Sequence, residues 1–173
     1  MPNFRIFGNS TSQIITSSEI ASENGNVYIV SSGIHQLDKS SNSVFIMYLT
    51  NNSSDKTFSL GNICGSCAIL SSFRLYNSTF SLTDPVNSYI HNGNSAFGVE
   101  GTIESKYKIQ STDPAATESS NLLGGFVQNS GVTIYPCNGS IQIGPGSSVS
   151  VIAKNIAASG TGVVGINISF IIS

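Results

Sequence analysis

Hydrophobic and polar residues alternate along most of this chain, with the period of two that is typical of half-buried β-strands. In the stretch 101–109, Ile103, Tyr107 and Ile109 share one face, and polar residues occupy most of the other. Four further stretches repeat this alternation: "FRLYN" (73–77), "SIQI" (140–143), "SVSV" (148–151) and "GINISFII" (165–172).

Two runs are apolar on both faces, namely "NVYIV" (26–30) and "SVFIMYL" (43–49). We expect them to be central strands, or strands whose outer face meets another subunit. Helix is predicted for two short pieces, 17–22 and 114–123.

Turn-forming residues separate the strands at close intervals, as in "HNGN" (91–94), "NSG" (129–131) and "ASGTG" (158–162). Asn, Asp, Gly and Pro each favour turns through their backbone conformation. About nine to eleven short strands with this spacing predict an all-β fold, an antiparallel β-sandwich of jelly-roll type. Residues 1–16 are predicted to form an N-terminal arm or first strand, and residues 17–173 a single sandwich domain.

The stretch "IQIGPGSSVSV" (141–151) raises the question of a phosphate-binding loop. Such a loop needs a Lys followed by Ser or Thr and then a helix, whereas here no Lys follows and the next residues alternate as a strand. We therefore predict a structural turn at Gly144, Pro145 and Gly146, with Pro145 at its second position and Gly146 at a positive φ. This turn is expected to be the corner of a hairpin between the flanking strands.

Charged residues make up only 9% of the 173 residues, and the net charge is −2. Ordinary domains contain about 25% charged residues, so this surface must be built from Ser, Asn, Thr and Gly, and copies of the chain are expected to cover part of it. Nucleic-acid binding is not expected because there is no basic cluster. A membrane span is not expected either, because no apolar stretch approaches about 20 residues.

Three cysteines, Cys64, Cys67 and Cys137, raise three alternatives. Buried or incidental thiols are favoured, followed by a disulfide within or between subunits. Metal binding comes last, because "CGSC" (64–67) lacks a second pair of ligands.

Catalytic residue patterns are missing from the sequence. His35 and His91 are both predicted to lie in loops, where a histidine is usually just solvated. We find no nucleophile elbow, zinc-protease or calcium-loop pattern. We therefore expect a non-enzymatic protein with no cofactor. Tyr28, Tyr76, Tyr89 and Tyr135 are either outward-facing residues that stack on sugars or half-buried cross-strand pairs.

Over about residues 43–173, the order of motifs resembles small all-β structural proteins of bacteriophage particles and bacterial surfaces. The matching residues are Arg74, Leu75, Tyr76, Asn77, Pro85, Val86, Asn87, Gly124, Gly125, Pro145, Gly146 and Ser147. The resemblance implies a virion or cell-surface structural component and no enzymatic residue. A weaker likeness links the chain to jelly-roll subunits of endospore appendages, but those carry cysteines in an N-terminal connector, and residues 1–16 contain none.

We therefore expect a structural protein that self-assembles or coats a phage particle, as a capsid decoration or tail-associated protein. Its partners would be copies of itself, as a trimer, together with capsid or tail proteins. The N-terminus "MPNFRIFGNS" has no secretory pattern, so we expect synthesis in the host cytoplasm and a final location on a virion or extracellular particle. The alternative is a receptor- or glycan-binding head of a phage fibre or bacterial appendage, with loops 50–56, 87–95 and 111–121 carrying recognition.

Overall fold

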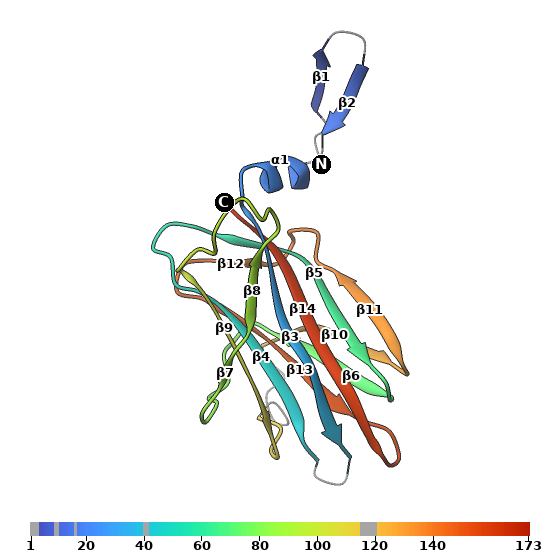
Figure 1. Cartoon of the computed structure of the whole chain (residues 1–173). Coiled ribbons are helices and arrows are strands. Elements are labelled where there is room, and N and C mark those ends of the chain that lie inside the picture. The colour runs from blue at the N-terminus through green and yellow to red at the C-terminus, as the bar shows by residue number, and fades with distance from the viewer. Residues whose placement is uncertain (1–3, 9–10, 16, 40–41, 115–120) are drawn as a thin grey trace.

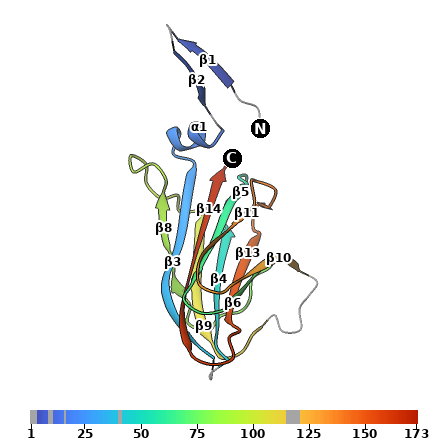
Figure 2. The ribbon, with the colours of Figure 1, turned by 90° about the vertical axis from the view of Figure 1, so that its right-hand side faces the viewer.

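The computed structural model describes residues 4–8, 11–15, 17–39, 42–114 and 121–173. Two antiparallel sheets pack face to face as a sandwich (Figures 1 and 2). The β4 sheet contains, in order, β10 (Leu122–Gln128), β6 (Ser71–Tyr76), β13 (Ser148–Asn155), β4 (Val44–Asn51), β9 (Ile103–Gln110) and β7 (Val86–Asn87). The β14 sheet contains β11 (Gly131–Pro136), β5 (Phe58–Cys67), β14 (Thr161–Ile172), β3 (Val27–Asp38) and β8 (Tyr89–Asn92), with β12 (Gln142–Ile143) also paired to β5.

The strand order is that of a jelly roll. Strands β3, β14, β5 and β11 are neighbours in one sheet, while β4, β13, β6 and β10 are neighbours in the other. The chain changes sheet at each step from β3 to β4, from β4 to β5 and from β5 to β6. It changes sheet again from β10 to β11 and from β13 to β14. The predicted all-β jelly-roll sandwich is therefore confirmed. Its sheets hold twelve strands among the described residues, of which β7 and β12 are only two residues long.

The core lies between the sheets and follows the predicted alternation. In β14, Val164, Ile166, Ile168, Phe170 and Ile172 are all buried. Aromatic rings stack along the inner face of the β14 sheet, where the Phe170 ring lies 5.1 Å from that of Phe58 and 5.7 Å from that of Tyr28. Between the sheets, the His35 ring of β3 lies 4.9 Å from the Phe45 ring of β4. Such pairs add stability beyond the area that they bury.

A second cluster buries the outer face of the β4 sheet. The covering loop (residues 77–85) places Phe80 and Leu82 against Val44, Ile46 and Tyr76. Phe80 meets the ring of Tyr76 edge-on at 5.3 Å. The run 43–49 is thus apolar on both faces because β4 is central in its sheet and the chain's own loop covers its outer side.

The N-terminal segment forms a hairpin of its own and a short helix. Strand β1 (Phe4–Gly8) pairs with β2 (Thr11–Ile15), and α1 (Ser17–Glu23) then leads into β3. Figure 1 shows the hairpin beyond α1, at the end of the sandwich where the C-terminus also lies. The helix predicted over 17–22 is confirmed.

The helix predicted over 114–123 is wrong where the structure describes it. Leu122 and Leu123 belong to β10, which pairs with β6. Gly124 and Gly125 follow at once, and glycine disfavours helix by about 1 kcal/mol relative to alanine. Residues 115–120 lie outside the described part of the chain.

Candidate functional site

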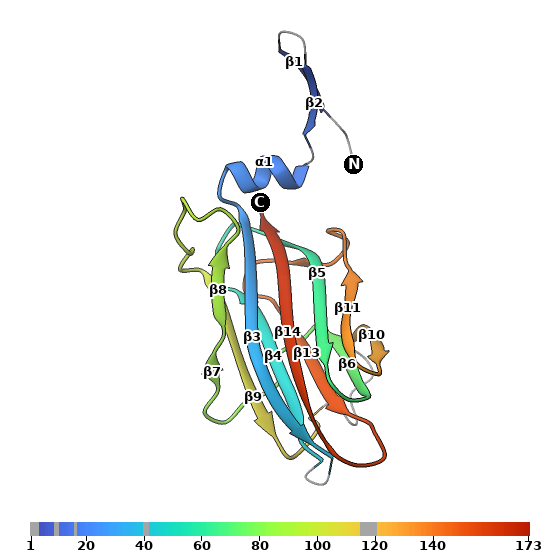
Figure 3. The ribbon, with the colours of Figure 1, turned by 45° about the vertical axis from the view of Figure 1, so that its right-hand side comes forward.

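One side of the sandwich leaves the edges of both sheets open. Within the described residues, strand β10 pairs only with β6 and β11 only with β5, so each strand has one edge without a paired strand, over seven and six residues respectively. Since Asn129 and Ser130 alone separate the two strands, these edges lie on the same side of the molecule (Figure 3). We call this surface the open side, defined as residues 122–136.

The open side is apolar and carries no charge. Val127 is 60% exposed on the outer face of the β4 sheet, and Val132 and Ile134 are 65% and 59% exposed on the outer face of the β14 sheet. Leu122 and Leu123 of β10 are exposed as well. Their neighbours Phe126 and Tyr135 point inward, with Phe126 stacked on Phe73 at 4.8 Å. The inward residues hold the edge strands in place while the outward residues have no partner within the described chain.

The opposite side of the sandwich has shorter edge strands. Its edge strands are β7, of two residues, and β8, of four residues. Lys106 stands opposite Asn87 of β7, so a charged side chain flanks that edge. Short strands and lysines are the usual protection of sheet edges against pairing with another chain. The open side lacks both, and we regard it as the candidate functional site.

Sequence reasoning did not single out Val127, Val132 or Ile134. A signal was nevertheless present, because residues 119–153 contain no charged side chain at all. A long uncharged stretch that spans two edge strands indicates a surface that another subunit can bury.

The predicted turn lies at a corner between the sheets. Ser147 N donates a hydrogen bond to Gly144 O (3.0 Å), and Gly146 has a φ of +69°, as in a type II turn. The hairpin predicted for this turn is wrong. Ile143 pairs with Phe58 in the β14 sheet, whereas Ser148 pairs with Thr50 in the β4 sheet. The turn therefore carries the chain from one sheet to the other.

Asn51 fixes that corner from inside. This fully buried side chain donates to Lys56 O (2.7 Å) and Ile143 O (2.9 Å), and it accepts from Ser53 N and Ser53 Oγ. Its backbone pairs with the turn, because Asn51 N donates to Ser147 O and Gly146 N donates to Asn51 O. Buried polar groups that are fully paired in this way rigidify a structure.

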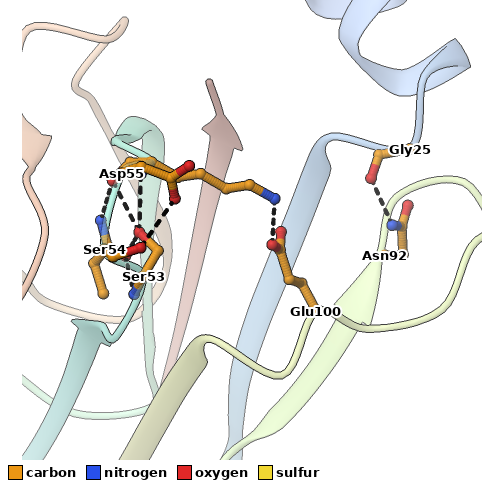
Figure 4. Close-up of polar contacts among 8 residues, drawn as sticks. Gly25, Ser53, Ser54, Asp55, Asn92 and Glu100 are labelled. Carbon is orange, nitrogen blue, oxygen red and sulfur yellow. Dashed lines mark hydrogen bonds and ion pairs between the residues drawn. The ribbon is translucent and has the colours of Figure 1, made fainter.

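Further polar contacts surround this corner. In Figure 4, Lys56 forms an ion pair with Glu100, and Asn92 Nδ2 donates to Gly25 O (2.7 Å). The first contact ties the loop after β4 to the segment before β9, and the second ties β8 to the end of α1. These contacts order the loops at this end of the molecule.

A matched pair of glycines tests the turn. Neither Gly144 nor Gly146 has an atom within 4 Å of an added Cβ, but only Gly146 has a positive φ. We expect Gly146→Ala to destabilise the fold by about 1 kcal/mol, because an L side chain disfavours that conformation. Gly144→Ala should change stability by less than about 0.5 kcal/mol. Equal urea midpoints for the two variants would contradict the assignment of the turn.

Both histidines lie in strands, so the prediction of loop histidines is wrong. His35 is in β3, stacked 4.9 Å from Phe45 and 4.5 Å from Tyr107, and its Nε2 lies 2.6 Å from Ser32 O. His91 is exposed in β8. No group of three or more His, Cys, Asp or Glu residues among the described ones has the geometry to hold a metal.

The four tyrosines do not form one outward-facing aromatic surface. Tyr28 and Tyr76 are buried, and Tyr135 is half-buried against Phe126. Tyr89 is exposed in β8. Of the loops expected to carry recognition, part of 87–95 is strand β8, and residues 115–120 of the third loop lie outside the described residues.

The three cysteines are free. Cys64 and Cys67 lie in the same strand, β5, where three residues span about 10 Å. A disulfide needs Cα atoms within about 7 Å, so strand geometry keeps these two thiols apart. Cys67 and Cys137 are buried, and burial raises the pKa of both thiols. Cys64 is half-exposed and stands opposite Ile134 of the open side.

This arrangement predicts selective labelling. With a maleimide at neutral pH, we expect the folded chain to take up one label, at Cys64, and the urea-unfolded chain to take up three. Buried thiols with a raised pKa react slowly because the thiolate is the nucleophile. Peptide mass spectrometry locates the label, and rapid native labelling of Cys67 or Cys137 would contradict the burial of those residues.

Comparisons with known proteins add little to these observations. No family model matches the sequence, and no curated protein matches it. Among solved structures, the chain is similar to "Structure of infectious bursal disease virus Gt strain", with 11% identity and a TM-score of 0.23. The match covers 99% of this chain and 46% of that one, so this chain spans less than half of its length. The fold assignment accordingly rests on strand order. No helix among the described residues is long and apolar enough to cross a membrane.

Proposed function

We propose that this chain is a non-enzymatic structural protein that assembles with copies of itself on a larger particle. The observation that carries the proposal is the open side, where two uncharged edge strands of seven and six residues lie on one side of the sandwich, flanked by exposed Val127, Val132 and Ile134. Unprotected edges of this kind pair readily with another chain. The low overall charge also favours self-assembly, because a neutral surface is easily buried between subunits.

The assembly we propose is a ring of three subunits. The open side of one subunit would meet a different surface of the next, and such head-to-tail contacts close into rings. The hairpin β1–β2 would add to the contact as a clip, because an isolated two-stranded sheet is only marginally stable in water. The particle would be a virion, with the chain as a capsid decoration or tail-associated protein, in line with the resemblance in its motif order.

Light scattering on the purified chain tests this proposal. At micromolar concentration we expect a molar mass about three times the 18.1 kDa of one chain. Dilution should lower the mass, since association depends on concentration. A mass of one chain at every concentration up to about 50 μM would overturn self-assembly.

A further inference from the structure

A polar groove crosses the outer face of the β4 sheet, two strands away from β10. It consists of two depressions of about 370 and 390 Å³ that share Thr79 and Ser148. Each depression is within the range typical of small-molecule sites, which is about 300–1,000 Å³. One wall and the floor come from the sheet, and the other wall comes from the covering loop.

The floor is a row of residues across three adjacent strands. Thr50 stands opposite Ser148 on one side and opposite Glu104 on the other. Directly opposed residues of antiparallel strands place their side chains on one face, close together. Accordingly, Thr50 Oγ1 lies 2.8 Å from Ser148 Oγ, and Tyr48 OH donates to Glu104 Oε1 at 3.3 Å.

The wall is held in place before any ligand arrives. Phe80 and Leu82 anchor the covering loop in the second hydrophobic cluster. Ser150 Oγ donates to Ser78 O (2.6 Å), and Lys108 Nζ donates to Asp84 O (3.1 Å). A site that is already ordered loses less conformational entropy on binding.

The chemistry of the lining selects the ligand class. Hydroxyls of Tyr48, Thr50, Thr79, Ser81 and Ser148 line the first depression together with one carboxylate, Glu104. These groups donate and accept hydrogen bonds, and a wholly apolar ligand would displace water from them without replacing its hydrogen bonds.

Glu104 stays ionised and excludes anions. Lys106 Nζ lies 2.8 Å from Glu104 Oε1, and Asn52 Nδ2 donates to Oε2 (3.0 Å). These hydrogen bonds, that of Lys106 first, lower the pKa of the Glu104 carboxyl. The Tyr48 hydroxyl also donates to Oε1, so three of the about four acceptor positions of the carboxylate are used and one on Oε2 can accept a hydroxyl proton. The nearest cation, Lys106, is already paired with it, so an anionic ligand would meet repulsion.

We propose that this groove binds a neutral saccharide, with Glu104 Oε2 accepting a hydrogen bond from a sugar hydroxyl. Thr50, Thr79 and Ser148 line the groove along the saccharide. The second depression extends the groove past Asn77 and Ser147, which suits an oligosaccharide better than a single ring. This inference does not depend on the open side, since the groove lies over β13, β4 and β9.

The test uses the purified full chain on an array of neutral, sialylated and sulfated oligosaccharides, followed by calorimetric titration of the strongest neutral ligand. Ser81→Trp, which places a large side chain in the groove, should weaken binding at least tenfold. Thr83→Trp is the matched control, because Thr83 is exposed in the same loop but does not line the groove, and it should stay within twofold. Glu104→Gln should weaken binding about tenfold with an unchanged melting temperature.

Silence across the array would overturn the proposal. Equal binding by the two tryptophan variants would overturn it as well, and so would a preference for sialylated or sulfated ligands. Because these readouts measure ligand binding and not molar mass, they are distinguishable from failure of the assembly proposal.

Discussion

A single lysine on the open side is expected to convert the assembled protein to monomers. In Val127→Lys or Ile134→Lys, an ammonium group would be buried against a neighbouring subunit without a partner, and such burial costs several kcal/mol. We expect the association constant to fall by at least about 100-fold, which corresponds to about 3 kcal/mol. Analytical ultracentrifugation at matched concentrations measures this change.

The control for these variants lies on the same sandwich. Ile34 in β3 is 75% exposed and is separated from the open side by β14 and β5. Ile34→Lys should therefore leave the molar mass unchanged. All three replaced side chains are exposed, so melting temperatures should stay within about 2 °C of one another once assembly is removed by dilution. Loss of assembly in Ile34→Lys alone would place the contact on the outer face of the β14 sheet instead.

Replacing Asn51 by alanine is expected to cause the largest loss of stability. The substitution leaves the Ile143 carbonyl without its side-chain donor and Ser53 N without its acceptor, around a fully buried position. The Lys56 carbonyl also loses the Asn51 donor but keeps a hydrogen bond from Ser53 Oγ. Each buried group left unpaired costs about 1–3 kcal/mol. We expect a loss of about 3 kcal/mol in the free energy of unfolding, or about 6–12 °C in Tm for a chain of this length.

Asn62→Ala is the matched control for Asn51→Ala. Asn62 lies in β5 and its side chain is exposed. Its backbone N–H donates to Ser169 Oγ, and its backbone carbonyl accepts from the same hydroxyl. Its replacement should change the free energy of unfolding by less than about 0.5 kcal/mol. Chemical denaturation followed by circular dichroism compares both variants, and a loss below 1 kcal/mol for Asn51→Ala would contradict the role we assign to this residue.

The sandwich could be predicted from the sequence because alternation is a local property. Ile166, Ile168 and Phe170 share a face in any half-buried strand, whatever its partners. Strand pairing is not local. Residues 141–151 looked like a hairpin because two alternating runs flank a turn, but contacts with Phe58 and Thr50, far away in the sequence, assign those runs to different sheets.

The open side and the groove could not be predicted because they also depend on contacts between residues far apart in the sequence. Val127 and Ile134 matter because their strands end the sheets, which depends on the order of all the others. Glu104 was interpreted as part of a polar sheet face, and it gains significance only from Thr50, Ser148 and the covering loop. Both histidines were predicted to lie in loops but lie in strands. A polar residue within a strand resembles a turn residue when glycines and asparagines are its neighbours in the sequence.

The position of the chain ends has a practical consequence for display. The helix α1 and the C-terminus lie at one pole of the sandwich, and the loop from β13 to β14 lies at the other (Figures 1 and 3). A fluorescent protein or antigen fused to either end would emerge from the same pole, which also carries the turn at Gly146 and Ser147. If subunits form a ring about an axis parallel to the strands, all of the cargo would gather on one rim, and the bare rim would be available for anchoring to a surface.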